Sequence, residues 1–412
     1  PVVSRISEAN RAFCSPSLIE PLRRTTARRL AVSCAHDAWI PSARRKHHRH
    51  TYVQASLRRL FGTPEPPPPR YDHRDDHSSG RLPLRSITDA VSYLTWRRAM
   101  TSVGAGPETI GGIVPPILTP LNPAGEVDLR SLARLVRYLA IGGVDGIWAC
   151  GTTGEFACID ADEREHVIAT VIETLEGKLP VIANVSDCST RLAIGHGRRA
   201  DAAGADAIAV TPPYYYGNSQ DELLDMYRRV RDAIDLPLYI YNIPSTVKTR
   251  VEIDTIVQLA TEGTVAGIKD SQGDLPWARE LAVAIAATGA PLRIFLGSKA
   301  MTEVGLISGI HGCIPGIANV VPRACVDAWH QTSRGNIEEA RVAQSTVDAA
   351  MGLLELTSGG RHARSFGGMK AALAAIGVIA HPTLAAPLHT PTSDEVTTVG
   401  ARARELGISV RP

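Results

Sequence analysis

The chain has 412 residues, 44% of them apolar, and a formal net charge of +2. This length fits one large domain with attached segments. No run of about eighteen apolar residues occurs, so we expect neither a membrane span nor a membrane partner. The seven cysteines include no Cys-x-x-Cys pair, which favours free thiols, a cytoplasmic location and no structural zinc site.

Charge is divided unevenly along the chain. Residues 1–99 hold 18 Lys+Arg against 8 Asp+Glu, whereas residues 100–412 hold 26 against 34. Binding to nucleic acid without regard to sequence requires clustered Lys and Arg on the folded surface. The acidic body of the chain therefore predicts no nucleic-acid partner.

Residues 1–99 show no sustained helical or strand period and include the proline run PEPPPP at 64–69. We expect this segment to be largely disordered. Met100 is the first methionine, and we expect translation to start there. An organelle-targeting presequence is an alternative, although aspartates within residues 72–76 break its acid-poor rule. A basic arm for nucleic acid is a third interpretation.

From Gly111 onward, short apolar runs alternate with segments of helical period. This alternation indicates parallel βαβ units. We predict eight strands, at residues 113–118, 146–150, 180–185, 207–211, 238–241, 265–269, 293–297 and 312–316.

Eight units in one series favour a closed barrel over an open doubly wound sheet, which usually has about five or six strands. The expected fold class is therefore α/β, a (β/α)8 TIM barrel over residues 109–334. Residues 335–412 show helical periods only, and we assign them to a C-terminal helical extension.

Two chemically capable residues end neighbouring predicted strands, where barrel active sites lie. Lys269 ends the sixth strand and Tyr241 ends the fifth. Burial disfavours an ammonium ion, and a neutral amine can attack a ketone to form a Schiff base. Tyr241 would shuttle protons during this reaction. Taken alone, Lys269 could instead pair with Asp270 or contact a phosphate.

Two further motifs follow predicted strands. GTTGE (151–155) offers the hydroxyls of Thr152 and Thr153 and the backbone N–H groups of a tight turn that begins at Gly151. Such a turn suits a small carboxylate, and the alternative is a glycine-permissive turn with threonine as a helix cap. PYYY (213–216) by itself is typical of packing.

The motifs GTTGE, PYYYGNSQ, YNIPS and GIKDSQGD occur in this order between residues 109 and 380. Together they resemble the dihydrodipicolinate synthase and N-acetylneuraminate lyase superfamily. The resemblance implies that Lys269 is the Schiff-base lysine and Tyr241 the catalytic tyrosine. It implies that Thr152 relays protons and that Thr153 binds the carboxylate of pyruvate.

The resemblance has two further implications for the site. Tyr215 matches a tyrosine that the family contributes across a tight dimer interface, so a homodimer or homotetramer is expected. Ile314 lies near a position that lines the pyruvate site.

One departure concerns the second substrate. Dihydrodipicolinate synthases contain YNxPxRT, in which the arginine binds the carboxylate of aspartate semialdehyde, whereas Thr246 takes that position here. Lys248 and Arg250 lie close by and either replace this arginine or belong to a solvated loop.

The expected function is a class I lyase or aldolase that acts on pyruvate or a 2-oxo acid and uses no metal or organic cofactor. Its partner substrate would be an aldehyde or a sugar acid, and its reaction the cleavage or dehydration of a 2-keto-3-deoxy sugar acid or hydroxy-oxo acid. The alternatives are 4-hydroxy-tetrahydrodipicolinate synthase and a catalytically silent barrel that binds a keto acid. A metal-dependent aldolase is disfavoured, because no His/Glu cluster ends the predicted strands.

Overall fold

The computed structural model describes residues 110–297, 305–306 and 308–410. The predictions made for residues 1–99 and for a start at Met100 lie outside the described residues, so they stay predictions. None of the helices in the described ranges has the length and apolar character required to cross a bilayer.

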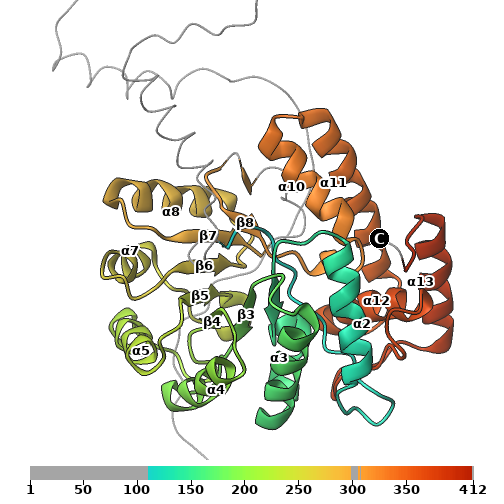
Figure 1. Ribbon diagram of the computed structural model, residues 1–412, viewed down its shortest axis with the longest axis horizontal. Helices are drawn as coiled ribbons and strands as arrows, with labels where there is room; N and C mark the ends of the chain where they lie inside the picture. Colours follow the sequence, from blue (N-terminus) through green and yellow to red (C-terminus); the bar gives the residue numbers. More distant parts are fainter. Residues whose placement is uncertain (1–109, 298–304, 307, 411–412) are drawn as a thin grey trace, which may run out of the picture. The chain divides into compact units, whose positions relative to one another are not determined.

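Eight parallel strands form one sheet in the order β1-β8-β7-β6-β5-β4-β3-β2, and helices surround it (Figure 1). The bounds are β1 Gly112–Ile113, β2 Ile147–Ala149, β3 Val181–Asn184, β4 Ala207–Val210, β5 Leu238–Asn242, β6 Gly267–Asp270, β7 Arg293–Leu296 and β8 Gly312–Cys313. Each strand begins within the run predicted for it or one residue before it, and the predicted (β/α)8 barrel is confirmed.

The barrel closes between the segment after β1 and strand β2. Trp148 donates its backbone N–H to the carbonyl of Pro115 (2.9 Å), and its carbonyl accepts from Ile117 (3.0 Å). The first strand is shorter than predicted, because Pro115 and Pro116 lack the N–H groups that a regular ladder requires. The chain nevertheless continues beside β2 and joins the two edges.

The helices follow the strands as a barrel requires. Their bounds are α2 Leu129–Ile141, α3 Ala161–Leu175, α4 Thr190–Ala202, α5 Gln220–Ala233, α6 Pro244–Val247, α7 Ile253–Thr261, α8 Leu275–Thr288, α10 Pro322–Arg334, α11 Ile337–Met351, α12 Arg361–Ala375 and α13 Ser393–Glu405. Within the described residues, short 3-10 helices lie at Thr152–Gly154, Phe156–Cys158, Gly316–Asn319 and Gly352–Glu355.

Local sequence explains several helix starts. A Ser, Thr or Asp followed three residues later by Glu allows each side chain to bond the other residue's backbone N–H. This capping box forms at Asp160 of α3, Ser219 of α5 and Thr392 of α13.

Strand alternation separates two apolar layers. Side chains such as Ile240 and Ile268 pack outward against the helices, whereas Trp148, Tyr239 and Tyr241 pack together inside the barrel. Successive side chains of a strand point to opposite faces. Lys269 follows Ile268, and it therefore points into the barrel interior.

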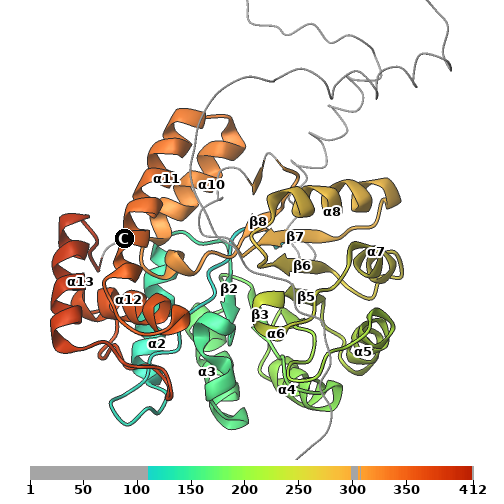
Figure 2. The ribbon, with the colours of Figure 1, turned by 180° about the vertical axis from the view of Figure 1, so that it is seen from behind.

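The last helices lie beside α2, as Figures 1 and 2 show from opposite sides. Arg134 of α2 donates to the carbonyl of Val378 (2.9 Å), and Ala380 donates to the hydroxyl of Ser131 (3.0 Å). Helices α12 and α13 pack against each other. The division into a barrel at 109–334 and an extension at 335–412 stays a prediction.

Candidate active site

Lys269 lies at the C-terminal end of β6, with only 3% of its surface exposed. Its amine lies 4.8 Å from the ring centre of Trp148 and 4.1 Å from that of Tyr241. Burial lowers the pKa of Lys269, although the nearby phenol opposes this shift. The amine is therefore more readily available in its neutral, nucleophilic form than an exposed lysine.

Tyr241 and Lys269 are direct partners in the register of β5 and β6. The phenol of Tyr241 lies 3.0 Å from the hydroxyl of Thr152, within hydrogen-bond distance, and either atom can be the donor. The Tyr241 ring meets Trp148 edge-on, with 5.4 Å between the ring centres. These contacts hold the phenol beside the amine and link it to a second hydroxyl.

The GTTGE turn (151–155) carries Thr152 and Thr153 to the same place. Gly151 allows close packing, because a Cβ there would lie 3.0 Å from the Trp148 ring and would force a small shift. Glu155 has a φ of 56°, a left-handed conformation that is uncommon outside glycine. The turn therefore depends on contacts that hold Glu155 in place.

Glu155 is held by the C-terminal helices. Its carboxylate lies 2.5 Å from the ammonium of Lys370 in α12, and both side chains are at most 1% exposed. The second carboxylate oxygen accepts from the backbone N–H of Ala385 (2.7 Å), and Lys370 donates to the carbonyl of Thr383 (2.7 Å). This buried pair connects the GTTGE turn to a segment more than 200 residues away in the sequence.

A cavity of about 290 Å³ opens at this end of the barrel, and we call it the Lys269 cavity. Its inner part is lined by five of the predicted site residues, Thr152, Thr153, Tyr241, Lys269 and Ile314. Its outer part is lined by residues of α12 and the turn before it, among them Glu355, Arg361, His362, Arg364 and Ser365.

Two predicted site residues lie elsewhere. Gly151 shapes the turn but does not line the cavity. Tyr215 is 88% exposed, with a φ of 89°, and its ring meets the neighbouring Tyr216 ring edge-on with 5.2 Å between ring centres. In a single chain, Tyr215 therefore does not reach Lys269.

The structure also shows the surroundings of Thr246, which replaces the arginine of the YNxPxRT motif. Thr246 lines the Lys269 cavity. Lys248 and Arg250 do not line it. The ammonium of Lys248 donates to the carbonyl of Ser245, and Arg250 pairs with Glu252 at 2.7 Å. The two cations proposed as replacements thus belong to the surface loop.

Sequence reasoning missed Trp148, the Glu155–Lys370 pair and the lining from α12. Trp148 was detectable, because strand alternation places it on the same face of β2 as the barrel interior. The contributions of α12 carried no motif. They depend on how the C-terminal extension folds back over the barrel.

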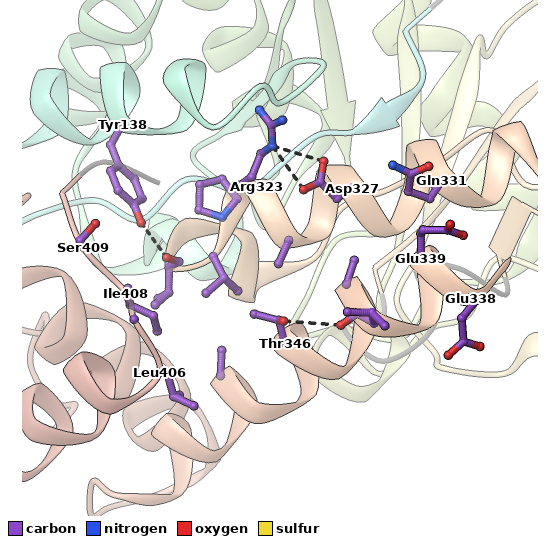
Figure 3. A pocket seen from close by; sticks show the side chains of 18 residues that line it. Tyr138, Arg323, Asp327, Gln331, Glu338, Glu339, Thr346, Leu406, Ile408 and Ser409 are labelled. Atoms are coloured by element: carbon purple, nitrogen blue, oxygen red, sulfur yellow. Dashed lines mark hydrogen bonds and ion pairs between the residues drawn. The ribbon is translucent and has the colours of Figure 1, made fainter. Parts of the chain in front are cut away.

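A larger cavity, of about 700 Å³, lies between α10, α11 and residues 406–409 (Figure 3). Its labelled polar side chains include Arg323, paired with Asp327, and Glu338 and Glu339. It shares no lining residue with the Lys269 cavity. Cavity volume therefore does not identify the candidate active site. The candidate is the Lys269 cavity, because its lining includes the nucleophilic amine and the neighbouring hydroxyls.

The sequence model of the Dihydrodipicolinate synthetase family matches residues 109–406. The chain belongs to this family. The resemblance inferred from the four motifs is thereby confirmed, and the protein is a lyase of the dihydrodipicolinate synthetase family.

Two relatives illustrate the range of the family. An uncharacterized DapA-like lyase of Halobacterium salinarum is 34% identical over 307 residues, which are 74% of this chain and 97% of that protein. A 4-hydroxy-tetrahydrodipicolinate synthase of Pelobacter propionicus is 35% identical over 233 residues, 56% of this chain and 78% of that protein.

Solved structures show the same fold. Dihydrodipicolinate synthase of Thermotoga maritima has a TM-score of 0.66 at 28% identity, covering 72% of this chain and 99% of its own. The dihydrodipicolinate synthase of Acinetobacter baumannii, solved in complex with pyruvate, has a TM-score of 0.66 at 29% identity, covering 73% and 100%.

Proposed function

We propose that this protein is a class I lyase or aldolase that forms a Schiff base between Lys269 and a 2-oxo acid. The observation that carries the proposal is the buried amine of Lys269 beside the Tyr241–Thr152 hydrogen bond. A neutral amine can form an imine with a ketone, and a phenol linked to a second hydroxyl can transfer the protons that this reaction moves. The pyruvate complex of the A. baumannii relative supports a 2-oxo acid as the substrate.

The reaction begins when the Lys269 amine attacks the C2 carbonyl of the 2-oxo acid. Tyr241 delivers a proton to the departing hydroxyl, which leaves as water and generates a protonated imine. This imine accepts the electron pair released when a carbon–carbon bond breaks, or when a C3 proton is removed before hydroxide leaves. The imine is itself the electron sink, so the chemistry requires neither a metal nor an organic cofactor.

The surrounding residues orient the acid. Thr153 and the backbone of the GTTGE turn would hold the carboxylate, and Ile314 would pack against the small carbon chain. Thr152 would pass protons to and from Tyr241. Tyr215 would act from a second copy of the chain in a homodimer or a tetramer of dimers. We place the enzyme in the cytoplasm.

A second candidate is 4-hydroxy-tetrahydrodipicolinate synthase, which the P. propionicus relative favours by its identity of 35%. Thr246 disfavours it, because this threonine stands at the position where dihydrodipicolinate synthases carry the arginine that binds the carboxylate of aspartate semialdehyde. A coupled reductase assay that measures the consumption of aspartate semialdehyde together with pyruvate distinguishes the two functions. A silent keto-acid-binding barrel is a weaker alternative, since binding alone needs no nucleophile.

The test of the proposal is borohydride trapping with pyruvate, read by intact and peptide mass spectrometry. We expect one reduced pyruvate adduct, on Lys269, and none in Lys269→Ala. Lys248→Ala is the matched control, because this lysine lies nearby but outside the cavity, and its adduct should equal that of the wild type. A folded wild-type protein that forms no adduct would contradict the proposal and favour the silent barrel.

A further inference from the structure

The Lys269 cavity extends well beyond the space that pyruvate needs. Its volume of about 290 Å³ reaches from Lys269 to the first turn of α12. Small-molecule sites enclose about 300–1,000 Å³ and bury most of their ligand. The outer half of the cavity is therefore available to the rest of a longer 2-oxo acid.

The charges that line the cavity do not balance. Among the described residues, its charged side chains are Lys269, Glu355, Arg361 and Arg364, apart from the titratable His362. Glu355 is compensated by Arg364, whose guanidinium lies 2.8 Å from its carboxylate. The exposed side chain of Arg361 has no ion-pair or hydrogen-bond partner within the described part of the chain. It is the one uncompensated cation of the outer cavity in these residues.

The remaining lining of the outer cavity is uncharged, and several of its residues are polar. Ser245, Thr246 and Ser365 contribute hydroxyls. His362 stacks on Phe366 with 5.4 Å between ring centres, and burial, followed by the charge of Arg361, lowers its pKa. His362 is therefore neutral near pH 7 and has one donor and one acceptor nitrogen. Such a lining matches a chain that carries hydroxyl groups.

We propose that the Lys269 cavity is built for 2-oxo acids that carry a second carboxylate beyond a hydroxylated chain, with Arg361 binding that carboxylate. The inference rests on the proposed function, because the 2-oxo end must reach Lys269. The planar guanidinium offers paired N–H donors to a carboxylate, which is the geometry that favours arginine over lysine. The second carboxylate takes no part in bond making or breaking.

The experiment uses competition between matched 2-oxo acids that differ only at the far end. The pairs are 2-oxoglutarate against 2-oxopentanoate and 2-oxoadipate against 2-oxohexanoate, each mixed in equal amounts with the full chain and trapped with borohydride. Mass spectrometry then gives the ratio of the two adducts on Lys269. Two chain lengths are used so that one of them spans the cavity.

For at least one pair, the wild type is expected to favour the dicarboxylate adduct by about tenfold or more, the size that a hydrogen bond to a charged group typically provides. Arg361→Gln should bring this ratio close to one. Arg361→Lys should keep part of the preference. Arg341→Gln, an exposed arginine of α11 outside the cavity, is the matched control and should keep all of it.

The outcomes separate this inference from the proposed function. Suppose that pyruvate is trapped on Lys269. A dicarboxylate-to-monocarboxylate adduct ratio near one in the wild type, the same ratio in Arg361→Gln as in the wild type, or no adduct of either longer acid would each overturn the role of Arg361. The Schiff-base function would still stand in each case. Absence of any adduct on folded wild-type protein would overturn the proposed function and this inference with it.

Discussion

Lys269 and Asp270 are neighbours in β6, but they face opposite sides of the sheet. Lys269 lies among the aromatic rings inside the barrel, whereas Asp270 accepts hydrogen bonds from Asn242 (3.0 Å) and Gln272 (2.9 Å). Burial lowers the pKa of Lys269 and raises the pKa of Asp270 to about 6. Burial stabilises the neutral form of both residues relative to the charged form, because moving a charge out of water costs free energy.

The hydrogen bond between Tyr241 and Thr152 predicts coupled effects on catalysis. Tyr241→Phe should lower kcat by about 100-fold or more, the size typical of a lost general acid, with binding of the 2-oxo acid largely retained. Thr152→Val should lower kcat less. If the two hydroxyls form one proton relay, the double variant should be little worse than Tyr241→Phe. Additive losses in steady-state assays would show that Thr152 acts independently.

Asp270 predicts a pH dependence of stability. Its pKa is about 6 in the folded protein against a reference of 3.8, so the folded state binds the proton more tightly. The ionised form therefore destabilises the fold above pH 6, and this cost disappears as the pH falls towards 3.8. Asp270→Asn should be more stable than the wild type at pH 8 by about 2–3 kcal/mol, with the difference lost near pH 4.

The measurement is urea unfolding of both proteins between pH 4 and pH 8. Asp201→Asn, an exposed aspartate of α4, is the control and should follow the wild type at every pH. A constant difference between wild type and Asp270→Asn across this range would show that Asp270 does not titrate as described.

At the scale of elements, the GTTGE turn depends on α12. The turn ends at Glu155, whose backbone is left-handed and whose carboxylate is paired with Lys370. The same helix begins at Arg361, on the wall of the Lys269 cavity. Helix α12 therefore supports the turn that carries Thr152 and Thr153 and also forms the outer wall of the site.

Breaking the buried pair should be costly. Lys370→Met leaves the Glu155 carboxylate buried without its cation, and removal of one partner of a buried pair typically costs about 3–5 kcal/mol. Adding Glu155→Gln should recover much of this loss, because glutamine keeps an oxygen for the N–H of Ala385. Urea unfolding measures all three proteins.

Two comparisons make this prediction specific. Lys178→Met removes an exposed partner of Glu176 and should change stability little, since surface pairs contribute little. If Lys370→Met were as stable as the wild type, or if the double variant were the less stable of the two, the pair would not hold the turn. Pyruvate trapping should weaken in Lys370→Met, because Thr152 and Thr153 lie in the same turn.

At the scale of the whole molecule, two neighbouring aromatic side chains are exposed in a single chain. The exposed fraction is 88% for Tyr215 and 76% for Tyr216. Exposed aromatic clusters are typical of protein–protein contact surfaces. Our proposal that Tyr215 completes the site of a second copy accounts for this exposure. One solved relative is described as a monomeric variant, so the assembly of this chain has to be measured directly.

Mixing of inactive variants tests the shared site. In a symmetric dimer, a Lys269→Ala chain paired with a Tyr215→Phe chain restores one complete site, which combines Lys269 of one copy with Tyr215 of the other. Random reassociation of equal amounts should therefore recover about a quarter of wild-type activity. Activity that stays at the level of the separate variants, in a sample shown by sedimentation to be a mixed dimer, would place Tyr215 outside the site.

The barrel and the inner site were predictable from the sequence, because both depend on local patterns. Strand alternation and strand ends placed Lys269 and Tyr241 side by side, and the four motifs identified the family. Tertiary structure alone decided the rest. The Glu155–Lys370 pair joins segments more than 200 residues apart, and Arg361 reaches the cavity from a helix far beyond Lys269 in the sequence. No local period encodes such contacts. Their positions depend on how the C-terminal helices pack against the barrel.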